Sequence, residues 1–117
     1  MIKTDFHKGD IYFANLDFVI GSEQSGTRPV VIVQNDIANK YSPTIIVAPI
    51  TSVNKKLKLS AHILIKYNRC LYHNSMILVE QIRTIDKSRL IRYMGRLSFS
   101  DIKRVDVALK KTLMIGG

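Results

Sequence analysis

Apolar residues form short runs separated by polar turns along most of this 117-residue chain. The run at 30–33 is continuous rather than alternating, which is typical of a strand buried on both faces. A second run ends near Pro49, which predicts a bulge or a sheet edge there. Strands are expected at six places: Asp10–Leu16, Pro29–Val33, Thr44–Thr51, His62–Ile65, Ser75–Gln81 and Ile91–Leu97.

Only the C-terminal segment has the spacing of a long helix. Ser98, with an acidic residue three positions later, matches an N-terminal capping box, and Leu97 can add a hydrophobic staple with Ile102. The apolar stripe expected on this helix consists of Ile102, Val105, Leu109 and Leu113. Single helical turns are expected in two further places, Asp36–Pro43 and Asp86–Leu90.

Short strands followed by one terminal helix predict a mainly β fold. The chain lacks the regular alternation of strands and helices that builds a parallel sheet. We therefore expect a small antiparallel barrel or tightly curled sheet with a C-terminal α-helix. Residues 1–117 are expected to form a single domain, because this length is close to the commonest domain size.

The charge of the chain points to an anionic partner. It carries 18 Lys and Arg residues against 9 Asp and Glu residues, a net charge of +9. No acidic residue lies between Ile37 and Val79, although six basic residues do. Such a segment favours binding to an anionic polymer or an acidic protein. A solvated face that only keeps the protein soluble is the alternative.

Several classes of protein are disfavoured. No apolar run reaches the roughly 20 residues that span a bilayer, and the first residues lack the apolar core of a signal peptide, so a cytoplasmic protein is expected. The single Cys70 fits a reducing compartment. The three histidines are scattered and no phosphate-loop or dinucleotide motif occurs, so neither a metal nor a cofactor is expected.

The clearest candidate for chemistry is Arg28, which follows a polar loop bracketed by Gly21 and Gly26. It stands immediately before the apolar run 30–33, where a loop meets a rigid element. A charged side chain at such a junction can be held still and yet face a ligand. We therefore consider Arg28 a candidate for binding phosphate.

Several motifs occur in a recognisable order: Lys8–Tyr12, Gly21–Gln24, Arg28–Ile32, Gln34–Asp36, Pro49–Thr51 and Glu80–Lys87. Each is weak evidence alone, but together they cover nearly the whole chain with strands between them. In these motifs the chain resembles the MazF/PemK/Kid family of bacterial type II toxin–antitoxin systems. It looks most similar to the MazF branch found in Gram-positive bacteria.

The resemblance implies an SH3-like barrel of the CcdB/Kid/MazF type that works as a homodimer. It implies a sequence-specific, metal-independent endoribonuclease that cleaves single-stranded mRNA to 2′,3′-cyclic phosphate and 5′-hydroxyl ends and so inhibits translation. It also implies a cognate acidic antitoxin similar to MazE or PemI. By position, Arg28 and Thr51 are the expected catalytic pair. The residues expected to line the RNA groove are Gly21, Ser22, Glu23, Gln24, Leu59, His62, Glu80 and Gln81.

Roles for these residues follow from the chemistry of RNA cleavage. Arg28 is expected to stabilise charge on the phosphate through a guanidinium fork, and Thr51 to position the phosphate through its hydroxyl. Glu23 is a candidate general base with His62 as the second choice, and orienting Arg28 is an equally good role for Glu23. The alternatives are a nucleic-acid-binding barrel without catalysis, an inhibitor of gyrase like CcdB, and a scaffold domain.

Overall fold

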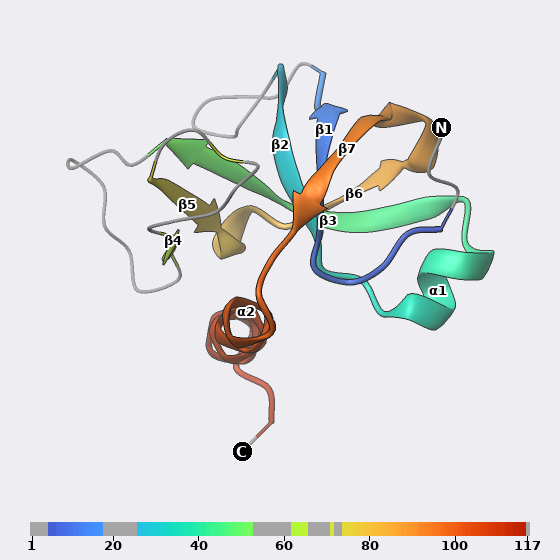
Figure 1. The fold of residues 1–117 in the computed structure, drawn as a ribbon. Coiled ribbons are helices and arrows are strands. Elements are labelled where there is room, and N and C mark those ends of the chain that lie inside the picture. The colour runs from blue at the N-terminus through green and yellow to red at the C-terminus, as the bar shows by residue number, and fades with distance from the viewer. Residues whose placement is uncertain (1–4, 18–25, 53–61, 66–70, 72–73, 117) are drawn as a thin grey trace.

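The computed structural model describes residues 5–17, 26–52, 62–65, 71 and 74–116. These residues form seven strands, two α-helices and two 3₁₀ turns (Figure 1). The strands are β1 (Asp10–Asn15), β2 (Thr27–Ile32), β3 (Thr44–Ser52), β4 (His62–Ile65), β5 (Ser75–Leu78), β6 (Arg83–Asp86) and β7 (Leu90–Arg96). The helices are α1 (Asp36–Tyr41) and α2 (Phe99–Leu113), and the 3₁₀ turns are η1 (Val79–Gln81) and η2 (Lys87–Arg89).

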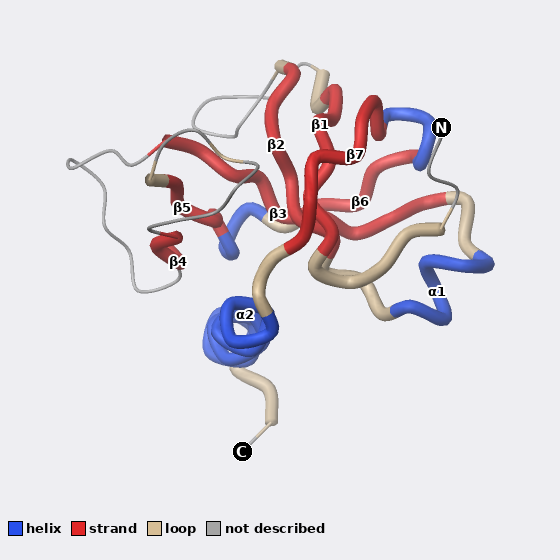
Figure 2. Tube along the Cα trace, viewed as in Figure 1, coloured by secondary structure: helices blue, strands red, loops and turns tan. Residues whose placement is uncertain are grey.

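The strands form one antiparallel sheet in the order β4-β5-β3-β2-β1-β7, with β6 paired to β3 outside this path. The expected mainly β fold with a C-terminal helix is confirmed. Figure 2 shows the sheet curled, with α2 on one side and α1 apart from it. Within the described residues no pairing joins the end strands β4 and β7, so the strands do not close a continuous ring.

β3 is the longest strand, and it changes partners along its length. Its first part pairs with β6, and Val47 to Pro49 pair with β2. From Ile50 onward the edge of β3 that faces away from β2 pairs with β5, with Thr51 opposite Met76. Near Pro49, where an irregularity was expected, β3 thus ends its pairing with β2 and exchanges β6 for β5 on its other edge.

Apolar side chains pack on both faces of the central strands. One cluster includes Val31 and Ala48 and lies against α2, and the other includes Val30 and Val47. Successive residues thus enter opposite cores, as strand geometry requires. The continuous apolar run in β2 is explained by burial on both faces, as the sequence predicts.

Gly9 allows α2 to approach the start of β1. Its φ of +92° favours glycine, and a Cβ at this position would lie 2.4 Å from Cδ1 of Ile102. Its backbone N–H donates to the carbonyl of Ile32, and its carbonyl accepts from the N–H of Leu97. A side chain at this position would displace the side chain of Ile102 from α2 and would strain the backbone at this positive φ.

The start of α2 agrees with the sequence, but the buried stripe on this helix is shorter than expected. The Ser98 hydroxyl accepts a hydrogen bond of 3.2 Å from the Asp101 N–H, so Ser98 is the N-cap. Val105 and Ala108 are buried against the sheet. Leu113 was expected in the apolar stripe, but it is 51% exposed because the last turn extends beyond the residues that form the core.

Two other expectations require correction. The strand expected at Ser75–Gln81 ends at Leu78, which pairs with His62, and the chain then turns through η1. The strand β6 was not expected, because among its residues only Ile85 is buried and the alternation is too short to notice. The helical turns expected within 36–43 and 86–90 are present as α1 and η2.

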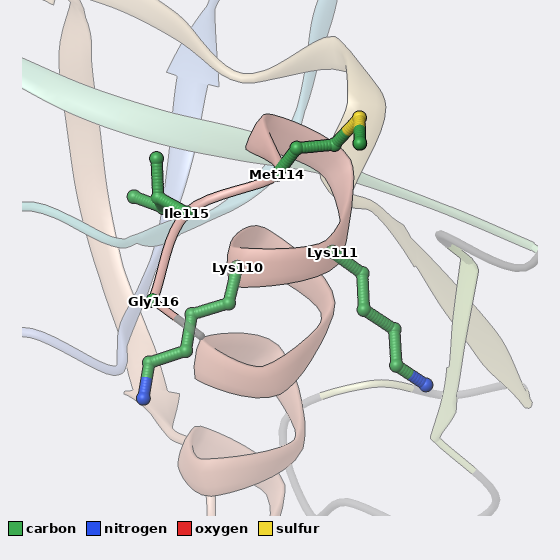
Figure 3. Close-up of a pocket in the computed structure, with 5 residues that line it drawn as sticks. All are labelled: Lys110, Lys111, Met114, Ile115 and Gly116. Carbon is green, nitrogen blue, oxygen red and sulfur yellow. The ribbon is translucent and has the colours of Figure 1, made fainter.

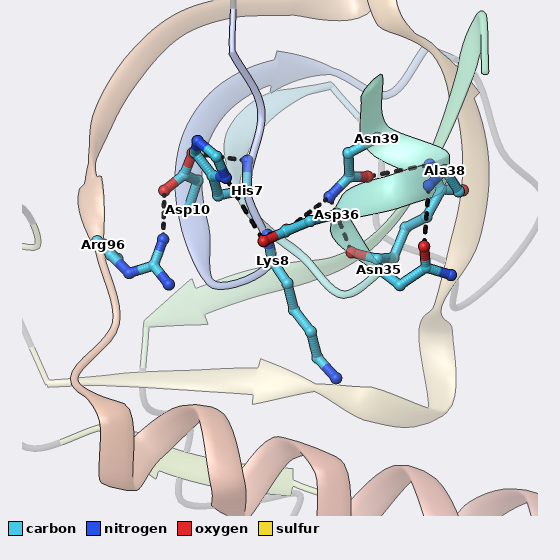
Figure 4. Close-up of polar contacts among 9 residues, drawn as sticks. His7, Lys8, Asp10, Asn35, Asp36, Ala38, Asn39 and Arg96 are labelled. Carbon is cyan, nitrogen blue, oxygen red and sulfur yellow. Dashed lines mark hydrogen bonds and ion pairs between the residues drawn. The ribbon is translucent and has the colours of Figure 1, made fainter. Parts of the chain in front are cut away.

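A polar network ties the N-terminal turn to the sheet and to α1 (Figure 4). The buried Asp10 carboxylate accepts hydrogen bonds from the His7 N–H at 3.0 Å and from Arg96 Nη1 at 3.2 Å. The Asp36 carboxylate accepts from the Lys8 N–H at 2.7 Å and lies 3.5 Å from the His7 ring. The network therefore joins β1, β7 and α1 through two carboxylates.

Replacing Arg96 by Gln is expected to lower the free energy of unfolding by about 1–3 kcal/mol, because it removes the cation beside a buried carboxylate. The Asp10 side chain is only 1% exposed. Arg89→Gln is the matched control, since its partner Asp17 is 52% exposed and such pairs contribute less than about 1 kcal/mol. Urea unfolding measures the free energy of unfolding of both variants. An equal loss of stability in the two would contradict a special role for the ion pair between Asp10 and Arg96.

Asp36 is expected to make stability depend on pH. The hydrogen bond from the Lys8 N–H, followed by contacts with His7 and Asn39, lowers the pKa of the Asp36 carboxyl. A lowered pKa contributes stability above the ordinary value of about 3.9 and loses it as the pH falls through the folded value. Asp36→Asn should therefore be less stable than the parent at about pH 6, with a smaller difference at about pH 3. A difference that grows in acid would contradict this.

Candidate active site

The ends of β2 and β3 separate where their pairing stops. The last paired residues are Val30 and Pro49, and continuing this register would place Arg28 opposite Thr51. Arg28 is instead held by pairing with Ala14 of β1, and Thr51 by pairing with Met76 of β5. Each residue thus lies on a strand fixed by another neighbour, and a gap opens between the two.

Arg28 and Thr51 line one cleft of about 500 Å³ at this gap. Hydroxyl groups are supplied by Thr27, Thr51, Ser52 and Ser75, and the cations are Arg28 and Arg92. The rest of the lining is apolar and includes Phe13 and Met94. The cleft therefore combines two guanidinium groups with several hydroxyls on an apolar floor, which suits a ligand with both phosphates and flat rings.

Arg28 is partly buried, and this affects its acidity. Burial away from water lowers the pKa of the Arg28 guanidinium. An arginine remains charged at neutral pH even so, because its ordinary pKa exceeds 12. A cation that has already lost part of its hydration interacts more strongly with an anion entering the cleft.

The other residues expected at the site are not all brought to this cleft. Glu80 and Gln81 lie half-buried in η1, which packs against α2, and they are absent from the described lining of the cleft. His62 begins β4, and its backbone pairs with Leu78. The expected RNA-contacting residues Gly21, Ser22, Glu23, Gln24 and Leu59 lie outside the described residues, as does the side chain of His62.

Apart from Arg28 and Thr51, none of the residues that line this cleft was expected at the site from the sequence, and Phe13, Ser75 and Arg92 are among them. Phe13 and Arg92 meet because β1 pairs with β7, which is nearly 80 residues away in the chain. No short-range pattern signals such a pairing.

A second hollow, of about 340 Å³, lies at the C-terminal end of α2 (Figure 3). The backbone turns back at Met114, whose N–H donates to the carbonyls of Lys110 and Lys111. Figure 3 shows the two lysine side chains pointing away from each other. Because their charges do not converge, this hollow is a poor candidate for an active site.

The described part of the chain contains no group of three or more His, Cys, Asp or Glu side chains placed to hold a metal ion. None of its helices is long and apolar enough to cross a membrane.

The sequence and the fold match a known class of protein. Residues 7–113 match the family of PemK-like, MazF-like toxins of type II toxin–antitoxin systems. The chain belongs to this family.

Three similar proteins are consistent with that assignment. Endoribonuclease EndoA of Bacillus subtilis (strain 168) is 49% identical over 109 residues, which cover 92% of this chain and 94% of EndoA. The crystal structure of MazF from Deinococcus radiodurans has a TM-score of 0.82 at 19% identity, covering 97% of this chain and 100% of that one. An endoribonuclease from Mycobacterial species, solved in complex with its cognate antitoxin, has a TM-score of 0.79 at 18% identity, covering 95% and 97%. The two structures show a shared fold.

Proposed function

We propose that this toxin endoribonuclease cuts single-stranded mRNA at the cleft between β2 and β3, with Arg28 and Thr51 as its catalytic residues. The observation that carries the proposal is that both residues, from separate strands, line one cleft of about 500 Å³. The family match and the 49% identity to EndoA support RNA as the substrate. Residues 1–117 would act as one toxin domain.

The proposed reaction uses the 2′-hydroxyl of the RNA as its nucleophile. The 2′ oxygen forms a bond to phosphorus while the bond from phosphorus to the 5′ oxygen breaks. One proton leaves the 2′-hydroxyl and another is delivered to the departing 5′ oxygen. The products are a 2′,3′-cyclic phosphate and a 5′-hydroxyl end, and no metal ion takes part.

Arg28 would stabilise the charge that grows on the non-bridging phosphate oxygens. A guanidinium offers two parallel charge-assisted hydrogen bonds, which match two oxygens of a phosphate. Partial burial strengthens this interaction and lowers the pKa of Arg28, the direction that favours proton donation to the leaving oxygen. Arginine is a poor base, so another group must accept the 2′ proton.

Thr51 would position the phosphate through its hydroxyl group. Its β-branched side chain restricts χ1, and its backbone is held by pairing with Met76. These two constraints fix the direction of the hydroxyl at little entropic cost. The proton acceptor would be Glu23, with His62 as the second candidate. Glu23 could instead orient Arg28.

The proposed partners are RNA, a second copy of this chain and an acidic antitoxin. The mycobacterial relative was solved with its cognate antitoxin. A net charge of +9 would speed association with an acidic segment similar to those of MazE or PemI, as it would with RNA. We propose that the toxin acts in the cytoplasm as a symmetric homodimer, because its mRNA substrate is there and the family resemblance implies that assembly.

Variants of the catalytic pair separate chemistry from folding. Arg28→Ala should reduce kcat by about a thousandfold, and Arg28→Lys should also lose most activity because it keeps the charge but not the fork. Thr51→Val keeps the shape and should reduce kcat by about ten- to a hundredfold. Cleavage of a fluorogenic RNA reports activity, and circular dichroism checks the fold. Full activity in Arg28→Ala would remove Arg28 from the mechanism.

Mapping the ends of cleaved RNA tests the reaction itself. A mixed-sequence RNA should yield 2′,3′-cyclic phosphate and 5′-hydroxyl ends, and cleavage should continue in excess EDTA. Replacing the target 2′-hydroxyl by hydrogen should stop it, because the nucleophile is lost. Continued cutting of that substrate would exclude cyclisation. RNA binding without cleavage would favour a nucleic-acid-binding barrel. The absence of both RNA binding and cleavage would favour a gyrase inhibitor like CcdB.

A further inference from the structure

Arg92 lies beside the catalytic pair but has no assigned role. It lines the same cleft as Arg28 and Thr51. On β7 it is opposite Phe13 of β1, and Phe13 is in turn opposite Pro29 of β2. Because neighbouring strands lie roughly 4.8 Å apart, the backbones of Arg92 and Pro29 are about 10 Å apart. Arg92 is therefore placed for a neighbouring part of the ligand that Arg28 holds.

The guanidinium of Arg92 is supported by an aromatic ring. Its central carbon lies 5.5 Å from the centroid of the Phe13 ring. The other two arginines on or beside β7 are paired differently, since Arg89 binds Asp17 and Arg96 binds Asp10. No carboxylate among the described residues forms an ion pair with Arg92.

The chemistry of this contact leaves Arg92 ready to bind an anion. A guanidinium that stacks on an aromatic ring contacts it with its flat face. The N–H donors lie in the plane of the group, so they remain available to a phosphate. Phe13 thus restrains the side chain without neutralising its charge, as a carboxylate would.

We propose that Arg92 binds the phosphate of a nucleotide next to the one that is cleaved, and that Phe13 is the positioning residue beneath it. The identity of the ligand as RNA rests on the proposed function. A contact with a neighbouring phosphate is the same in the ground state and in the transition state. It therefore contributes to RNA affinity and KM rather than to kcat.

The chain offers a matched control outside the cleft. Lys103 on α2 lies above the ring of Phe99, with 4.8 Å between its Nζ and the ring centroid. This pair also consists of a cation on an aromatic ring, but it does not line the cleft. If Arg92 only adds surface charge, Arg92→Gln and Lys103→Gln will have the same effect.

Binding is measured by fluorescence anisotropy with a labelled, mixed-sequence RNA whose 2′-hydroxyls are all methylated, so that it cannot be cut by cyclisation. Phosphate contacts are independent of sequence, which makes a mixed probe suitable. Arg92→Gln should weaken binding by roughly five- to tenfold at low salt. It should also reduce the slope of log affinity against log salt by about 0.7, the value for one phosphate contact on a single strand. Lys103→Gln should change neither quantity, and equal behaviour of the two variants would overturn the proposal.

Phe13→Leu tests the positioning role. It keeps an apolar side chain and the charge of Arg92 but removes the aromatic face. Affinity should fall by about two- to fivefold while the salt slope stays at the parent value. Unchanged affinity would remove Phe13 from the proposal. Arg92 is exposed, so Arg92→Gln remains informative even if circular dichroism shows that Phe13→Leu is unfolded.

Cleavage kinetics separate this proposal from the proposed function. With a cleavable RNA, Arg92→Gln should raise KM and leave kcat within about twofold of the parent. A fall in kcat at unchanged KM would overturn the assignment of Arg92. A parent protein that binds the methylated RNA but cuts no RNA would overturn the proposed function, while the salt slope would still decide the role of Arg92.

Discussion

The strand β3 lies between β2 and β5 in the sheet, and its pairing with β2 ends at Pro49. Beyond Pro49 only the other edge of β3 is paired, with β5. If the β2 pairing continued, Arg28 and Thr51 would be cross-strand neighbours in a closed sheet. Because it stops, their strands separate and the two side chains line an open cleft. The cleft therefore depends on where the pairing between β2 and β3 ends.

The rest of the fold holds these two strand ends in place. Apolar residues of β2 and β3 alternate between a core covered by α2 and a second core on the opposite face. Gly9 lets α2 come close to β1, and the buried Asp10 joins β1 to Arg96 at the end of β7. Neither strand can move without disturbing a core, so the cleft is built on a rigid frame.

The cleft uses its two arginines in different ways. Arg28 loses part of its hydration to burial, which strengthens its interaction with a phosphate. Arg92 is exposed and is restrained by the Phe13 ring instead. In the proposed reaction, the partly buried Arg28 acts on the phosphate where charge develops. The exposed Arg92 binds the phosphate of the neighbouring nucleotide of the RNA. This division follows from their different surroundings, since both side chains are chemically identical.

Much of the fold could be predicted from local patterns. The apolar runs identified β2 and β3, and the serine before α2 identified its N-cap. β6 was missed because only Ile85 is buried, and Leu113 was wrongly assigned to the core because periodicity does not show where a helix extends beyond the sheet. The position of Arg28 between a polar loop and an apolar run made it a candidate for binding phosphate, whereas Thr51 could be selected only through the family resemblance. The catalytic roles of both residues remain predictions.

By itself, the sequence determined which segments become strands, where the long helix begins and that the surface is basic, because these properties depend on residues close together in the chain. Only the tertiary structure decided that Arg28 and Thr51 share a cleft and that Arg92 and Phe13 join them. These contacts depend on where β3 leaves β2 and on the pairing of β1 with β7. Strand partners are chosen by burial of whole faces over long separations, which no local pattern records.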